Sequence, residues 1–348
     1  MATSTKSIPM WNYSTTASRD GKTYKGTMVG RSPFFHGART TNINTILVPV
    51  AVTFQDTGTV FDPTATDANC LPNGTVTATT LTQQSPILLP ANFTMNGVDE
   101  GATQYVDAFQ RANFFQAVDP TGNSYHTLLN LTATLSAISV SIAAAHGGTF
   151  AGLGGCSPLG VVDVNTFDNM VIKTLLPSLA SQGVGPTTVP IFLLYNVAMS
   201  TGPPHQDLGN CCILGYHSGI GSGSKTQLYS VADYDSSQDF GGTNSGTWNT
   251  AVLSHEIAEL MDDPLTNNPT PSWGKIGQVA GCQRNLEVGD PLSGTFFPEV
   301  TMPNGITYDL QELAFYSWFF GSPSIGAGGV FSDNGTPPFD SDAGAICS

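Results

Sequence analysis

The chain has 348 residues, and its 11 Lys and Arg stand against 26 Asp and Glu, which gives a formal net charge of -15 and a pI near 4.4. A chain of this length can bury a substantial core, and its negative charge argues against nucleic acid as a partner. The most apolar long stretch, residues 128–145, is interrupted by Asn, Thr and Ser, so no membrane-spanning segment is predicted.

The first half of the chain predicts strands before helices. Residues 1–42 look extended and irregular, and residues 43–54 are apolar and β-branched, which predicts a buried strand. Residues 56–90 are rich in Thr, Pro, Gly and Asn, so short edge strands and loops are expected there. Residues 100–116 repeat aromatic and small apolar residues at helical spacing and predict an amphipathic helix.

The second half alternates helices and strands. Residues 164–181 predict a helix, residues 190–199 a second buried strand, and residues 226–233 an edge or hairpin strand. A Gly- and Ser-rich loop then leads into a helix at residues 248–262, and an aromatic-rich segment at 308–320 is expected to pack beneath it. No repeat or linker divides residues 43–348, so they are predicted to form one α+β domain after an extended N-terminal segment, 1–42.

Composition also indicates a compartment. Charged residues are only 11% of the chain, while Ser, Thr, Gly and Asn are abundant, as is typical of secreted proteins. The first 35 residues lack the apolar core of a signal peptide, so a mature form is expected. It is expected to be extracellular and to act as a monomer. An even number of cysteines without Cys-x-x-Cys spacing predicts disulfides of open pairing, among Cys70, Cys156, Cys211, Cys212, Cys282 and Cys347.

Residues 254–264 carry the strongest chemical signal, Ser-His-Glu-Ile-Ala-Glu-Leu-Met-Asp-Asp-Pro, in a chain with only six glutamates. On a helix, His255 and Glu259 lie one turn apart on the same face and can bind one metal ion, while Glu256 stands beside them and can take a proton from water. The alternative is a surface helix with solvated acids. Since no Lys or Arg occurs between residues 225 and 275 to pair these acids, a cation is favoured.

A third ligand is expected from the segment downstream of this helix. Glu287 is the predicted ligand and Asp290 the reserve, and one of them could instead orient His255. Asp262 is a further candidate for a supporting or alternative ligand. Zinc is the predicted ion, with calcium as the alternative if more of the acids bind it.

A second concentration of reactive residue types lies upstream, in Cys211-Cys212-Ile213-Leu214-Gly215-Tyr216-His217. His217 or Tyr216 is predicted to stabilise the oxyanion of a tetrahedral intermediate, and His217 could also be a ligand. A histidine bonded to backbone at a strand end is the open alternative.

These motifs resemble two known groups. His255-Glu256-x-x-Glu259 resembles a variant of the zincin metallopeptidase motif, and Glu287 lies at a spacing similar to the third ligand of its gluzincin branch. The same helix, followed by Glu287-Val288-Gly289-Asp290, is similar to a motif pair of exordium-like (phosphate-induced) secreted proteins of plants and their bacterial relatives. The zincin resemblance implies a mixed β-sheet with an active-site helix that carries the metal ligands, and thus an α+β, zincin-like fold.

Three functions remain open at this point. The first is a secreted zinc endopeptidase acting on proteins or peptides, in which Glu256 activates water. The second is an extracellular metal-binding protein without catalysis, as the exordium-like resemblance implies. The third is a carbohydrate-active enzyme that uses paired acids such as Glu256 and Glu287.

Overall fold

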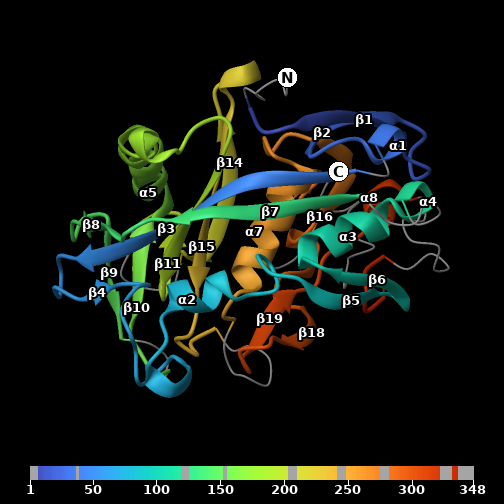
Figure 1. Ribbon diagram of the computed structural model, residues 1–348. Helices are drawn as coiled ribbons and strands as arrows, with labels where there is room; N and C mark the ends of the chain where they lie inside the picture. The colour runs from blue at the N-terminus through green and yellow to red at the C-terminus, as the bar shows by residue number, and fades with distance from the viewer. Residues whose placement is uncertain are drawn as a thin grey trace.

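The computed structural model describes residues 7–36, 39–118, 125–151, 155–202, 210–240, 248–274, 282–321 and 331–335. Its centre is a mixed sheet with the order β14-β15-β11-β3-β4, and two further strands, β7 and β8, also pair with β3 (Figure 1). The prediction of an α+β fold is confirmed. The bounds of the sheet strands are β3 Thr40–Phe54, β4 Val60–Phe61, β7 His126–Thr134, β8 Ile138–Ile142, β11 Val189–Tyr195, β14 Gly215–Ile220 and β15 Gln227–Tyr234.

The sheet separates two apolar cores, because side chains alternate between its faces. In β11, Ile191 and Leu193 enter one core, while Phe192 and Leu194 enter the other. β3, β11 and β15 pair in parallel and are apolar on both faces, as is typical of strands covered on both sides. The predicted buried strand at residues 43–54 is therefore confirmed.

Helices cover both faces of the sheet. α7 (Ala251–Asp262) lies against the face that β14 and β15 share with the larger core, and all twelve of its residues are buried (Figure 1). On the other face, α5 (Val164–Met170) continues through a π-helical turn (Val171–Leu175) into α6 (Leu176–Ser178). A helix buried all round needs partners for every polar side chain it carries, and α7 carries two glutamates and a histidine.

Smaller elements complete the fold. Of the N-terminal segment, residues 10–29 form a hairpin, β1 with β2, whose Met28 and Val29 pack into the larger core, so this part is more regular than expected. The remaining strands are β1 Met10–Thr16, β2 Thr23–Val29, β5 Ala91–Met95, β6 Val98–Thr103, β9 Gly147–Phe150, β10 Leu159–Asp163, β12 Val197–Ser200, β13 Cys211–Ile213, β16 Pro269–Gly274, β17 Cys282–Asn285, β18 Phe296–Thr301 and β19 Thr307–Gln311. The remaining helices are α1 Pro33–His36, α2 Ala78–Gln83, α3 Tyr105–Asn113, α4 Phe115–Val118 and α8 Tyr316–Phe320.

Three predicted elements differ in detail. The helix expected at 100–116 begins only at Tyr105, because the preceding residues pair with β5 as strand β6. The strand expected at 190–199 is two strands in different sheets, divided at Asn196, whose φ of 52° turns the chain. The strand at 226–233 forms the expected hairpin, with β14, but it is interior to the sheet rather than an edge, since β15 lies between β14 and β11.

Two disulfides join described cysteines, Cys70 to Cys156 and Cys211 to its neighbour Cys212. Cys282 is disulfide-bonded as well, and Cys347 lies outside the described residues. The prediction of disulfides is thus confirmed for this part of the chain. None of the described helices is long and apolar enough to cross a membrane.

Candidate metal centre

The helix α7 brings the predicted motif residues together as the helical spacing requires. His255 Nε2 lies 3.1 Å from Glu259 Oε2, one turn further along the helix, and 4.0 Å from Glu256 Oε1. All three side chains are buried. The pair His255 and Glu259 therefore presents one nitrogen and one oxygen to a common point.

The chain after β17 returns over α7 and brings a third residue, Asp290, to His255 and Glu259. The amides of Gly289 and Asp290 both donate to Glu259 Oε1, at 3.0 and 3.1 Å, which holds the loop against the helix. Asp290 Oδ1 lies 3.6 Å from His255 Nε2. Ligand atoms of His255, Glu259 and Asp290 lie within 4.8 Å of one another, and we call them the first group.

Gly289 makes this approach possible. A Cβ at this position would lie 2.6 Å from the His255 ring, closer than a Cβ atom comes to a non-bonded atom of another residue. Only glycine allows the loop to lie directly on the imidazole.

The orientation of His255 is fixed by Gln311, the last residue of β19. Gln311 Nε2 donates to the Gly289 carbonyl at 2.6 Å, so its amide oxygen faces His255. That oxygen lies 2.8 Å from His255 Nδ1 and accepts its proton, so in the neutral ring the lone pair of Nε2 is directed at Glu259 and Asp290. Histidines that bind metals are oriented in this way by the partner of their other nitrogen.

Glu287, the predicted third ligand, belongs to a neighbouring group. Its Oε2 lies 3.8 Å from His217 Nε2, and ligand atoms of His217, Glu259 and Glu287 lie within 4.8 Å of one another. We call these three the second group. The two groups meet at Glu259, whose Oε2 is 3.6 Å from His217 Nδ1.

Tyr216 and Asp262 lie apart from both groups. Because side chains alternate along β14, Tyr216 points into the opposite core, where it packs edge-to-face on Tyr229. It does not line the cavity described below, so we assign it no part in the site. Asp262 follows Glu259 by three residues but accepts hydrogen bonds from Tyr316 Oη and from Gln110 Nε2, and it joins neither group.

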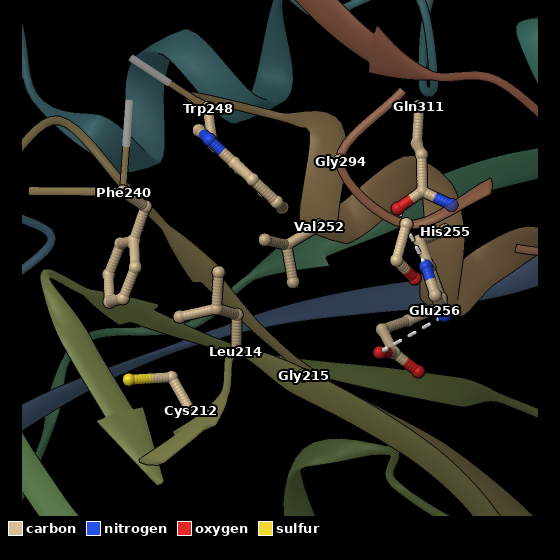
Figure 2. Close-up of a pocket in the computed structure, with 11 residues that line it drawn as sticks. Cys212, Leu214, Gly215, Phe240, Trp248, Val252, His255, Glu256, Gly294 and Gln311 are labelled. Carbon is tan, nitrogen blue, oxygen red and sulfur yellow. Dashed lines mark hydrogen bonds and ion pairs between the residues drawn. The ribbon is translucent and has the colours of Figure 1, made fainter. Parts of the chain in front are cut away.

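A cavity of about 220 Å³ adjoins the first group. Figure 2 shows Gln311, His255 and Glu256 side by side at one end of this cavity, whereas the other end is apolar, with Leu214, Phe240, Trp248 and Val252. His217 is not among the residues that line it. A substrate in the cavity would thus meet Glu256 and His255, and His217 would lie behind them.

Gly215, on the same face of β14 as His217, also serves the cavity. A Cβ there would lie 2.7 Å from Glu256 Cγ and 2.8 Å from Val252 Cγ1. The glycine therefore leaves room for the Glu256 carboxylate beside the strand.

Burial and like charge set the protonation of these acids. Burial raises the pKa of Glu256, although both histidines oppose this effect. Burial, and then the neighbouring Glu259, raise the pKa of Glu287 well above its usual range. Burial disfavours charged His255, but Glu259 and Glu256 outweigh it and raise the pKa of the imidazole well above its usual value. Either a proton or a bound cation must therefore supply positive charge among these carboxylates.

Burial also raises the pKa of Asp262 from 3.8 to about 7. The folded protein then holds this proton more tightly than the unfolded chain, so the contribution of Asp262 to stability is lost as pH rises from about 4 to about 7. In metal-free protein, the free energy of unfolding of Asp262→Asn should therefore rise relative to that of wild type by up to about 4 kcal/mol as pH increases across this range. Urea unfolding at several pH values measures this difference in the free energy of unfolding. The exposed Asp99→Asn is the control and should show no such gain. If Asp262→Asn differs from wild type by the same amount at about pH 4 and at about pH 7, the protonation of Asp262 is contradicted.

Two residues of the centre were not predicted from the sequence. Gln311 lies in the segment 308–320 that was expected to pack beneath the helix, but nothing in its spacing indicates a partner for His255. Gly289 stands within the Glu287–Asp290 motif, and its need for close approach to an imidazole depends on the tertiary structure. A search against protein-family models, curated proteins and solved structures found no match for this chain.

Proposed function

We propose that this protein is a metal-dependent peptidase of the zincin type, with a zinc ion bound by His255 Nε2, Glu259 and Asp290. The observation that carries the proposal is the first group itself, beside an open cavity. His255 Nε2 lies 3.1 Å from Glu259 Oε2 and 3.6 Å from Asp290 Oδ1. Neighbouring ligand atoms of a tetrahedral zinc ion with bonds of 2.0–2.1 Å lie about 3.3 Å apart, which is close to both distances.

The donor set suits zinc better than calcium. Calcium binds oxygen ligands almost exclusively, whereas the first group contains an imidazole nitrogen with its lone pair facing two carboxylates. The tautomer fixed by Gln311 and the room left by Gly289 are features that an ordinary buried histidine does not need. We therefore retain zinc as the proposed ion, with Asp290 in place of Glu287.

Glu256 is the proposed general base. Its carboxylate lines the cavity next to His255, and burial raises its pKa, which makes it a better proton acceptor near neutral pH. Bound zinc would acidify water and polarise a carbonyl at this end of the cavity. Glu256 would take the proton from the attacking water and pass it to the leaving amine.

The walls of the cavity support a peptide substrate. Leu214, Phe240, Trp248 and Val252 form an apolar surface beside Glu256, suited to a side chain of the substrate. The disulfides support a secreted protein, as the composition predicts. His217 does not line the cavity, so we assign it no contact with the oxyanion.

Cleavage of an unfolded, soluble protein tests this function. Chelation should abolish cleavage, and addition of zinc to the chelated protein should restore it. Cleavage that persists in protein shown by elemental analysis to be free of metal would contradict the proposal.

The orienting role of Gln311 gives a separate prediction. Gln311→Ala removes the acceptor of the His255 Nδ1 proton and should weaken zinc binding by about 10- to 100-fold. Competition with a chromophoric chelator measures this affinity. The exposed Gln55→Ala is the matched control and should bind zinc as wild type does; equal affinity in both variants would exclude the orienting role.

A further inference from the structure

We propose that a second divalent cation binds between His217, Glu259 and Glu287, so that the centre holds two ions bridged by Glu259. The proposal rests on the first ion proposed above and adds a second position, on the side of Glu259 away from the cavity. Three elements supply its ligands: β14, α7 and the segment after β17.

Glu287 provides the observation that points to a cation. It is 7% exposed, and its Oε2 is buried without a hydrogen-bond partner. The other oxygen, Oε1, accepts from Asn285 Nδ2 at 2.7 Å, which fixes the carboxylate with Oε2 toward His217. A buried carboxylate oxygen with no donor is costly unless a proton or a metal ion compensates it.

His217 faces this cluster with both ring nitrogens, Nε2 toward Glu287 and Nδ1 toward Glu259, and Nδ1 is the one that can bind an ion. Its Nε2 lies 3.0 Å from the carbonyl of Asp263 and donates its proton there. In the neutral ring, Nδ1 then carries a lone pair that lies 3.5 Å from Glu256 Oε2 and 3.6 Å from Glu259 Oε2. Lone pairs and carboxylates that face one another at these distances require a positive charge between them.

The balance of charge leaves room for a second ion. One zinc ion is neutralised by Glu259 and Asp290, so the buried Glu287 and Glu256 must each be compensated by a proton or by a second cation. The ion pairs of these acids involve only His217 and His255, among the described residues. The same oxygen of Glu259, Oε2, lies 3.1 Å from His255 Nε2 and 3.6 Å from His217 Nδ1, so it can bridge two ions, which in two-metal sites are about 3.5–4 Å apart.

The position of the second ion indicates what it does. His217, Glu259 and Glu287 are all buried and none lines the cavity, so this ion would not contact substrate. It would hold Glu259 in place from behind and neutralise the acids that remain. Its proposed role is to position the bridging carboxylate of the first ion.

Metal stoichiometry tests the proposal. Purified protein is stripped with chelator, reloaded with zinc alone or manganese alone, dialysed, and analysed for metal per chain. Wild type should bind two ions, and Glu287→Gln should bind one while retaining the first. Glu299→Gln, at an exposed position of β18, is the matched control and should retain two.

His217→Gln provides a second route if Glu287→Gln does not fold, and should also reduce the count from two to one. One ion in wild type, unchanged in these variants, would overturn the second site and leave the proposed peptidase intact. Two ions in a wild type that cleaves no peptide would support the second site and contradict the peptidase. No bound ion would overturn both.

Discussion

Glu256→Gln is expected to lower the cleavage of an unfolded protein substrate by at least about 100-fold while zinc remains bound. A positioned general base contributes about 10²- to 10⁴-fold, and the amide cannot accept the proton of the attacking water. The variant keeps the shape of the side chain in the space beside Gly215, so folding should be retained. Initial rates at saturating zinc measure the effect.

The control for this experiment is Glu299→Gln, which makes the same chemical change at an exposed position. It should cleave at the wild-type rate. If Glu256→Gln does so too, with metal content unchanged, then Glu256 is not the base. If instead that variant loses zinc, the carboxylate acts as a ligand, and its assignment must change accordingly.

Glu259→Gln is expected to have the largest effect on metal binding. The amide oxygen can take the place of Oε1 and still accept from Gly289 and Asp290, so the loop should remain on the helix. The NH₂ group would then face the lone pair of His255 Nε2, where Oε2 now lies at 3.1 Å. Zinc affinity should fall by more than the roughly 100-fold that is typical for loss of a supporting group.

Because Glu259 belongs to both groups, its loss should remove both ions, whereas Glu287→Gln should remove only one. Calorimetric titration with zinc distinguishes these outcomes, and circular dichroism shows whether the variant is folded. A folded Glu259→Gln variant that binds zinc with wild-type affinity would contradict the central role of this carboxylate.

The local part of the site could be predicted from the sequence. A helix fixes the positions of His255, Glu256 and Glu259 relative to one another, because residues four apart lie one turn apart whatever surrounds them. The scarcity of glutamate and of nearby positive charge then indicated that this cluster is unusual. The same reasoning predicted the buried strand β3, whose apolar run needs no knowledge of its neighbours.

The tertiary part of the site could not be predicted in the same way. Glu287 lies in a loop, and Asp290 begins the short 3₁₀ helix that follows, so spacing does not tell which of them faces His255. The structure places Asp290 beside His255 and Glu287 beside His217. Likewise, whether Tyr216 or His217 faces the helix depends on which face of β14 is covered by α7.

Anomalous diffraction at the zinc edge, from crystals of zinc-loaded protein, tests the central claim most directly. We expect a peak about 2.0–2.1 Å from His255 Nε2, with an oxygen of Glu259 and one of Asp290 at similar distances. A second peak beside His217 would add the second ion. Zinc bound only elsewhere, with His255 Nε2 in contact with no metal, would contradict the account.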